Sequence, residues 1–245
     1  MYSPGGIGDV GRHAVRAALD QWKGTVRVLT KSPATLLDDP NWNCSCENPH
    51  IFSDADIKRL EVVSIDVSKE EISSQHMANV GTVVSALGNR QPFYGHREGA
   101  PGTLNLIRAM EASNIDRVVA VTSVGCNEDW PPVEFHWVGG ILTWLFRTVV
   151  RDGYRDLSGA ETALKQSKLN YLLVRPMGLG ETQKNKGEYF IQKEKGKDKV
   201  APVISKMDCA TFVVKEALEP SYQKTAVVIG GDWENFELDP PKNKE

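Results

Sequence analysis

A glycine-rich turn that opens a helix is the feature that most constrains the fold of this chain. Residues 5–11 read Gly-Gly-Ile-Gly-Asp-Val-Gly, and the apolar spacing that follows predicts a helix over 12–22. A run rich in β-branched residues, 25–30, comes next. Small residues let the backbone of such a turn approach a diphosphate, and the helix N-terminus offers free N–H groups to that anion. The segment therefore predicts a dinucleotide site; a plain glycine turn before a helix is the alternative.

The residues of this turn that we expect to contact the diphosphate are Gly5, Gly8, Asp9, Val10 and Gly11. Asp9, the acidic residue among them, suits the first turn of a helix because its negative charge interacts favourably with the helix dipole. Its carboxylate would nevertheless lie close to the anion, and Arg12 could compensate its charge.

The end of the 25–30 strand distinguishes between two forms of the cofactor. A site for NAD usually carries an acidic residue about 20 residues past the glycines, on the ribose 2′-hydroxyl. Here the strand ends in Thr30, Lys31 and Ser32, with no acid. One positive charge and two hydroxyl groups suit a 2′-phosphate, so we expect NADP(H) at these residues. A solvated Lys-Ser turn is the alternative.

The segment before the glycine turn is short. A unit of this kind begins with an apolar strand, but only residues 1–4 precede Gly5, and Pro4 cannot donate a hydrogen bond to a sheet. We therefore expect a truncated first strand, or a chain cut from a longer product.

Length and composition fit one large α/β domain. The chain has 245 residues, of which 40% are hydrophobic, and this is enough for a full core. The net charge of −3 gives no indication of a basic surface that would bind nucleic acid. The longest apolar run, 137–146, is too short to span a bilayer. Cys44 and Cys46 form no metal-ligand spacing with the other two cysteines. We expect a cytoplasmic location, or an organelle if a targeting peptide is missing from this chain.

Strands and helices alternate along the rest of the chain. Apolar runs predict strands over 60–66, 80–88, 116–123, 170–175 and 225–230. Helical spacing predicts helices over 70–77, 102–113, 156–167 and 208–218. This rhythm predicts a Rossmann-like, doubly wound parallel sheet in a single NAD(P)-binding domain, 1–238, with a polar, disordered tail, 239–245.

Ligands of such sheets bind at the carboxyl ends of the strands, near the point where strand order reverses. Small or polar residues stand at several of these ends. The additional cofactor contacts expected there are Asp66, Val67, Ala86, Leu87, Gly88, Arg90, Thr122, Pro176, Met177 and Gly178. We expect the Asp66 carboxylate to accept a hydrogen bond from the adenine amino group. We expect the segment 86–88 to pass beneath the ribose and the nicotinamide.

Several of these segments together resemble the atypical short-chain dehydrogenase/reductases. The segments are 5–11, 26–33, 85–91, 117–125 and 160–179. The chain is most similar to the NAD(P)-binding, NmrA-like group that includes biliverdin-IXβ reductase (flavin reductase), over about residues 5 to 231. In the flavin reductase branch, the resemblance implies a serine beside the nicotinamide at the position of Ser123, with Thr122 supporting the cofactor.

Two departures from the family pattern bear on the chemistry. The active-site histidine of the branch aligns with Gly178, so that acid is missing. The wider superfamily uses a Tyr-x-x-x-Lys pair, in which the lysine makes the tyrosine a better acid; Tyr154 stands at the first position and Ser158 at the second. Without the cation, Tyr154 should be a poor acid at neutral pH. Alternatively, Tyr154 is a structural aromatic residue at the surface or at a helix cap.

The segment 129–151 is rich in large apolar side chains and follows the strand that ends at Ser123. In this architecture it would lie beside the nicotinamide, where it could wall a flat aromatic acceptor. It could equally form a lid, or an apolar patch for a partner chain or a membrane surface.

Hydride transfer to a flavin or quinone needs no dedicated protein acid, because solvent can supply the proton. We therefore expect an NADP(H)-binding oxidoreductase that reduces a flavin, a quinone or a related conjugated acceptor, with Ser123 and Tyr154 as candidate catalytic residues. The alternative is a non-catalytic NADP(H)-binding redox sensor or scaffold of the NmrA-like type. The expected partner is a small-molecule hydride acceptor, and a homo-oligomer is compatible with the sequence; no metal, nucleic acid or membrane span is expected.

Overall fold

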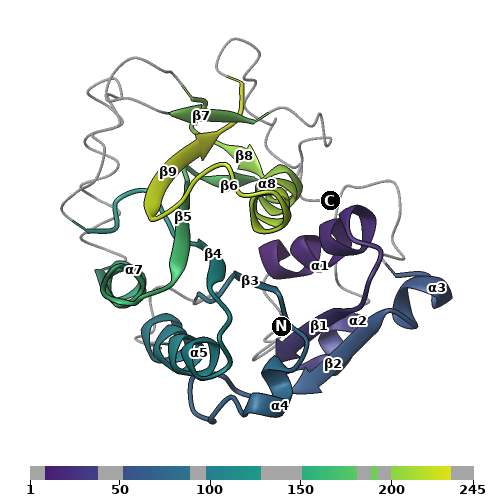
Figure 1. Ribbon diagram of the computed structural model, residues 1–245. Helices are drawn as coiled ribbons and strands as arrows, with labels where there is room; N and C mark the ends of the chain where they lie inside the picture. The colour runs from purple at the N-terminus through teal and green to yellow at the C-terminus, as the bar shows by residue number, and fades with distance from the viewer. Residues whose placement is uncertain are drawn as a thin grey trace, which may run out of the picture.

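The computed structural model describes residues 9–37, 52–88, 98–127, 151–180, 189–192 and 200–232. Along these residues, strands alternate with helices, and the helices cover both faces of a sheet whose strands are mostly parallel (Figure 1). This is the Rossmann-like, doubly wound α/β fold that the sequence predicts. The predicted tail at 239–245 lies outside the described residues, so the domain boundary at 238 stays a prediction.

The larger sheet has five strands in the order β3-β4-β5-β9-β7. They are β3 (Thr82–Ser85), β4 (Arg117–Val121), β5 (Asn170–Pro176), β9 (Thr225–Gly230) and β7 (Phe190–Gln192). The first four strands are parallel to one another. The last, β7, is antiparallel to β9 and was not predicted from the sequence.

A second, two-stranded sheet consists of β1 (Val26–Thr30) and β2 (Leu60–Ser64), which run parallel. Figure 1 shows β1 between β3 and β2, and β4 pairs with β3 on the other side, so strand order reverses between β1 and β3. In a Rossmann fold the first strand lies at this position. The predicted truncated strand belongs to residues 1–8, which lie outside the described residues.

Helices pack in pairs on the two faces of the sheet. The helices α1 (Asp9–Gln21) and α8 (Lys206–Leu218) contact each other on one face, and α5 (Gly99–Ala112) and α7 (Arg151–Gln166) contact each other on the opposite face (Figure 1).

Alternate residues of β4 belong to different apolar clusters. Val119 packs in the cluster that includes residues of α1 and α8, whereas Val118 packs in the cluster that includes residues of α5 and α7. The two-residue period of a strand divides the side chains between the faces in this way. As expected for a central parallel strand, β4 is buried on both faces.

Five short elements escaped the sequence analysis. They are α2 (Pro33–Leu37), α3 (Asp54–Ile57), β6 (Leu179–Gly180), β7 and β8 (Ile204–Ser205), whereas α4 (Ser74–Met77) is the second half of the helix predicted over 70–77. One helical turn or a two-residue bridge is too short to establish a hydrophobic period, so the sequence carries no signal for it.

Several predicted boundaries are wrong, because polar first turns carry little periodic signal. The helix α1 begins at Asp9 rather than at residue 12, and α7 begins at Arg151 rather than at residue 156. The strand β3 is shorter than the predicted 80–88. Three of its four residues are only partly buried, because β4 is its single partner among the described strands.

We expect Leu172→Ala to destabilise the protein strongly, because Leu172 on β5 is 0% exposed. Deleting such a side chain leaves a cavity and costs about 2–5 kcal/mol of unfolding free energy. The control is Leu104→Ala on α5, since Leu104 is 45% exposed and its loss should cost less than about 0.5 kcal/mol. Urea denaturation measures both, and equal losses would contradict this assignment of the core.

Candidate cofactor and active site

The first turn of α1 contributes Asp9, Val10 and Gly11 to the candidate site. The side chain of Val10 is half-buried and packs against the apolar cluster that includes residues of α1 and α8. Gly5 and Gly8 lie outside the described residues, and so does the side chain of Asp9. The role of the glycine turn in binding a diphosphate therefore stays a prediction.

Arg12 ties this first turn to the neighbouring helix. Its buried guanidinium group donates from Nη2 to the Leu36 carbonyl oxygen at 2.9 Å and to the Thr35 carbonyl oxygen. These carbonyls lie near the C-terminal end of α2, where a helix leaves carbonyl groups without an internal partner. The sequence presented Arg12 as a countercharge to Asp9; the described bonds also make it an anchor for α2, the helix that follows the turn at 30–32.

That turn carries the three residues expected at a 2′-phosphate. The Thr30 hydroxyl accepts a hydrogen bond from the Ser32 N–H at 3.1 Å and so closes the turn after β1. Lys31 extends outward, and its Nζ lies 2.7 Å from both carboxylate oxygens of Glu98. The candidate phosphate-binding cation is therefore held by an acid from a segment 67 residues away.

The carboxylate of Asp66, just beyond β2, closes its own turn. It accepts from the Ser68 hydroxyl at 2.6 Å and from the Ser68 N–H at 3.1 Å, and Lys69 lies 3.2 Å away. These interactions, the Ser68 hydroxyl first among them, hold the pKa of Asp66 below its ordinary value. The expected contact of Asp66 with adenine stays a prediction, and the carboxylate that would make it already has these partners.

The ends of β2 and β3 meet at the first turns of α5. A Cβ atom added at Gly102 would lie 3.0 Å from Leu87 Cδ1 and 3.4 Å from Val67 Cγ2. The structure thus brings together two residues that the sequence placed at the cofactor. Ala86 is half-buried beside Leu87, and a Cβ atom at Gly88 would meet nothing within 4 Å among the residues that the structure describes. Arg90 lies outside the described residues.

A fully buried ion pair lies beneath the carboxyl ends of β4 and β5. Glu161 of α7 is 0% exposed and Arg175 of β5 is 1% exposed. Arg175 Nε lies 2.9 Å from Glu161 Oε1, and its Nη2 lies 2.5 Å from Oε2. Two further donors complete the carboxylate: the Thr122 hydroxyl at 2.7 Å and the Asn127 side-chain amide at 2.9 Å. One carboxylate therefore connects β4, β5, α7 and the loop that follows β4.

This cluster changes the role expected for Thr122. The sequence predicted that Thr122 supports the cofactor, but its hydroxyl donates into the interior, so any support acts through the position of the strand end. Sequence reasoning missed Glu161 and Arg175. The available signal was a charged residue inside each of two apolar runs, since charges are buried only when they are paired.

The structure brings the two candidate catalytic residues to one loop. Ser123 follows β4 and is half-buried, with its hydroxyl donating to the Val124 carbonyl oxygen at 3.2 Å. Gly125 has φ +94°, and a Cβ atom there would lie 3.2 Å from Tyr154 Cε1 and 3.8 Å from the tyrosine hydroxyl. The half-buried ring of Tyr154 therefore lies against the loop that Ser123 begins. Glycine at 125 leaves room for the ring.

The position of the family's lysine is taken by a structural hydroxyl. The Ser158 Oγ accepts from the Asn127 N–H at 3.2 Å, so it holds the same loop and supplies no positive charge. Nearby, burial raises the pKa of Cys126 to about 12, so its thiol stays protonated near neutral pH. Neither residue provides an acid or a thiolate nucleophile.

The position of the family's histidine has no room for a side chain. A Cβ atom at Gly178 would lie 2.9 Å from the carbonyl oxygen of Pro202, which is backbone and cannot rotate away. Pro176 pairs with Ile229 of β9, and the Met177 N–H donates to the Ile229 carbonyl oxygen at 3.1 Å. The segment from Pro176 to Gly178 thus lies at the carboxyl end of β5 as expected. The aromatic residues between 129 and 150 lie outside the described residues.

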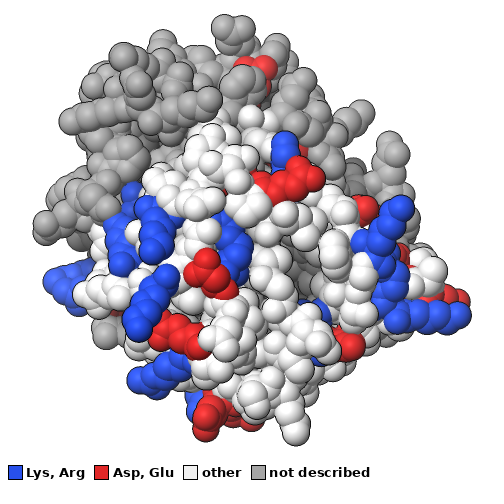
Figure 2. All heavy atoms as spheres, in the orientation of Figure 1, with Lys and Arg blue, Asp and Glu red and all other residues white. Residues whose placement is uncertain are grey.

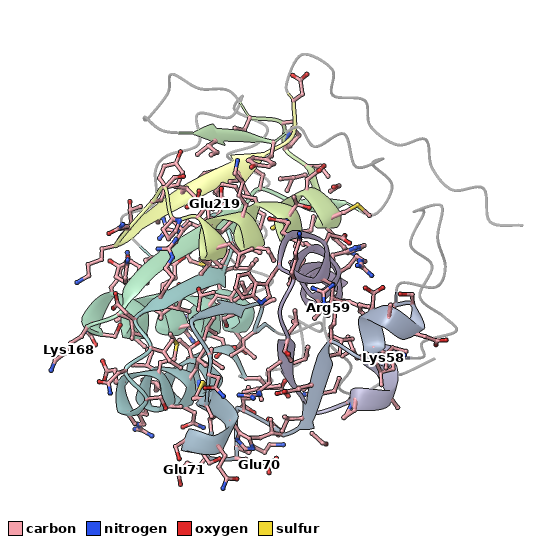
Figure 3. All side chains as sticks on the ribbon, turned by 45° about the vertical axis from the view of Figure 1, so that its right-hand side comes forward. Lys58, Arg59, Glu70, Glu71, Lys168 and Glu219 are labelled. Carbon is pink, nitrogen blue, oxygen red and sulfur yellow. The ribbon has the colours of Figure 1, made fainter. Side chains whose placement is uncertain are left out.

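Charged side chains are mixed on the face shown in Figure 2, where basic and acidic groups lie close together over the region of α5, α7 and β5. In Figure 3, Lys58, Glu71 and Lys168 lie at the periphery of the ribbon. Within the described ranges, no three His, Cys, Asp or Glu side chains are grouped so that they could hold a metal ion. Among the same residues, no helix is both long enough and apolar enough to cross a membrane.

Together, a doubly wound sheet and a line of strand ends that carry small and polar residues define a dinucleotide-binding Rossmann-like protein. The family model described as NAD(P)H-binding matches residues 5–220. The chain belongs to this NAD(P)H-binding family, and its cofactor class is NAD(P)H.

Solved structures share the fold over nearly the whole chain. A short-chain dehydrogenase/reductase from Veillonella parvula in complex with NADP is 15% identical, covers 94% of this chain and 93% of its own, and has a TM-score of 0.68. The anaerobilin reductase ChuY from Escherichia coli O157:H7 is 16% identical, covers 96% of both chains and has a TM-score of 0.63. At these identities the likeness establishes the Rossmann-like α/β fold.

Curated relatives include the chloroplastic protein TIC 62. The Arabidopsis thaliana protein is 26% identical over 129 residues, which is 50% of this chain and 18% of that protein. The rice protein is 27% identical over 192 residues, which is 73% of this chain and 35% of that protein. The chain therefore spans only 18–35% of the length of these two relatives.

We expect Glu161→Ala to destabilise the protein by about 3–5 kcal/mol, because it leaves the Arg175 guanidinium group buried without its carboxylate. The matched control is Asp20→Ala, which removes an ion pair with Arg16 in which the Asp20 side chain is 60% exposed. Such a surface pair contributes about 0–1 kcal/mol. Thermal and urea denaturation measure both variants, and a loss at Glu161 no larger than that of the control would contradict the structural role of the buried pair.

Proposed function

We propose that this protein is an NADP(H)-dependent reductase that transfers hydride to a flavin, a quinone or a related conjugated acceptor. The observation that carries the proposal is the loop after β4, which includes Ser123 and against which the Tyr154 ring of α7 lies at Gly125. In a doubly wound sheet, the carboxyl end of the strands, next to the point where strand order reverses, is where ligands bind.

The residues at the strand ends suit an extended dinucleotide. The first turn of α1 would face the diphosphate, and Lys31 with Ser32 would hold a 2′-phosphate. Val67 and Leu87, which meet at Gly102, would offer an apolar surface to the adenosine half. The open space at Gly88 leaves the backbone accessible to a ribose. The nicotinamide supplies the hydride when it is bound, and the protein supplies binding, orientation and electrostatics.

The missing acids restrict the class of acceptor. Ser158 supplies no cation to Tyr154, and the backbone at Pro202 fills the space that a histidine at 178 would need. A flavin or quinone takes up hydride into a conjugated system, and its proton can come from water. Ser123 would orient such an acceptor through a single hydrogen bond. The known reductases among the structural neighbours, such as the anaerobilin reductase, make reduction of a conjugated molecule a consistent choice.

A second candidate function is binding of NADP(H) without turnover, as a redox sensor or scaffold. Two substitutions favour it. Ser158 stands where the superfamily has the lysine that makes the tyrosine a better acid, and Gly178 stands where the branch has its active-site histidine. Turnover separates the two functions: NADPH oxidation in the presence of a flavin and a panel of quinones supports the reductase, and tight binding without oxidation of any acceptor supports the sensor.

We further propose that the protein works in an organelle. The names of the curated relatives place those proteins in the chloroplast, which supports this alternative over the cytoplasm. Its reaction partner would be a small-molecule hydride acceptor, and a second copy of the chain is a candidate macromolecular partner.

We expect NADPH to bind at least about tenfold tighter than NADH, which corresponds to about 1.4 kcal/mol. The physical reason is the charge of Lys31 beside the 2′-phosphate. Lys31→Asp should abolish this preference, whereas Lys58→Asp on an exposed turn should retain it. Isothermal titration calorimetry measures the four affinities, and equal binding of the two cofactors by the unmodified protein would overturn the assignment.

We expect Ser123→Ala to lower kcat while the Kd for NADPH changes little, because the hydroxyl acts on the acceptor and contributes little to cofactor binding. Tyr154→Phe should lower kcat less, because Ser158 provides no positive charge to make the tyrosine an effective acid. Steady-state oxidation of NADPH with a flavin and a quinone gives kcat, and fluorescence titration gives Kd. Activity that survives in the serine variant and disappears in the tyrosine variant would reverse the two roles.

A further inference from the structure

Lys31, the residue assigned to the 2′-phosphate, already holds an anion. Its Nζ lies 2.7 Å from Oε1 and 2.7 Å from Oε2 of Glu98, so one ammonium group contacts both oxygens of the carboxylate. The side chains are 35% and 33% exposed, which leaves the pair accessible to a ligand that competes for the lysine.

The carboxylate of Glu98 makes no capping hydrogen bond to its own helix, α5. Glu98 is the N-cap residue of α5, a position from which a side chain ordinarily accepts from the first N–H groups of the helix. Its side chain makes no such capping bond. Instead, the Gly99 N–H donates to Asp156 Oδ2 at 2.7 Å and the Ala100 N–H donates to Asp156 Oδ1 at 2.9 Å. Because Asp156 of α7 caps α5, the carboxylate of Glu98 is available to Lys31.

The ion pair joins the two sheets at the end where the cofactor is expected. Lys31 directly follows β1 of the two-stranded sheet, and Glu98 directly precedes α5, the helix that comes after β3 of the larger sheet. The pair therefore crosses the point where strand order reverses, on the side of the carboxyl ends. Dinucleotides bind at this point in doubly wound sheets.

We propose that Glu98 is a specificity-determining residue that occupies Lys31 in the cofactor-free protein and competes with the 2′-phosphate for it. The inference rests on the proposed NADP(H) function. A phosphate monoester carries about −1.5 to −2 charges at neutral pH and would repel a carboxylate on the same ammonium group. Binding of NADPH therefore requires the Glu98 carboxylate to leave Lys31. Binding of NADH, which has no 2′-phosphate, requires no such displacement, so Glu98 weakens the preference for NADPH that Lys31 creates.

The test uses the full chain and the Kd values of NADPH and NADH by isothermal titration calorimetry. Glu98→Gln keeps the size of the side chain and removes its charge. It should bind NADPH about fivefold tighter, the scale of one accessible ion pair, and should change the Kd for NADH less than about twofold. The matched control is Glu61→Gln, which breaks the Arg27–Glu61 ion pair between the strands β1 and β2, 2.7 Å long, and should leave both affinities unchanged.

A double-variant cycle separates competition for Lys31 from a general effect of removing a negative charge. In the Lys31→Ala background, Glu98→Gln should change the Kd for NADPH less than about twofold, because the site of competition is gone. The same gain in both backgrounds overturns the proposal. So does an unchanged or weaker affinity of Glu98→Gln for NADPH, which would mean that the carboxylate orients Lys31 for the phosphate. If Lys31→Ala leaves the ratio of the Kd values for NADPH and NADH unchanged, the assignment of Lys31 to the 2′-phosphate is itself wrong.

Discussion

The buried ion pair between Glu161 and Arg175 is the interaction on which the arrangement of the site depends. Two charges in an apolar interior cost several kcal/mol unless every acceptor and donor around them is satisfied. The Thr122 hydroxyl and the Asn127 amide complete the carboxylate at hydrogen-bond distance. Because the four residues come from β5, α7 and the loop that follows β4, the position of the strand ends is coupled to that of this loop.

The ion pair between Lys31 and Glu98 joins the two sheets at the point where strand order reverses. It differs from the buried pair in its exposure to solvent. Its side chains are about one-third exposed, so water and ions screen it and a ligand can displace it. The carboxylate of Asp156 fixes the adjoining helix end from inside the fold. The carboxyl ends of the strands thus combine a buried ion pair beneath β4 and β5 with a partly exposed ion pair between the end of β1 and the start of α5.

The chemistry that remains at this end of the sheet is that of a binding and orienting site. The ring of Tyr154 lies against Gly125, but its family partner is replaced by Ser158, whose hydroxyl holds the backbone of Asn127. The family's histidine position is closed by a carbonyl oxygen of the chain itself. Ser158 supplies no cation to Tyr154, and the backbone leaves no room for a side chain at position 178; both observations support the proposal of a conjugated acceptor.

The sequence by itself determined the fold class and most of its elements, since these follow from local patterns. The strand β9 was predicted with the bounds that it has, whereas the binding of a 2′-phosphate at residues 30–32 stays a prediction from three adjacent residue types. Only the tertiary structure decided the pairing of Lys31 with Glu98, the burial of Glu161 and the closure of space at Gly178. These features depend on residues far apart in the chain that approach within a few ångströms, and neither periodicity nor composition carries information about such contacts.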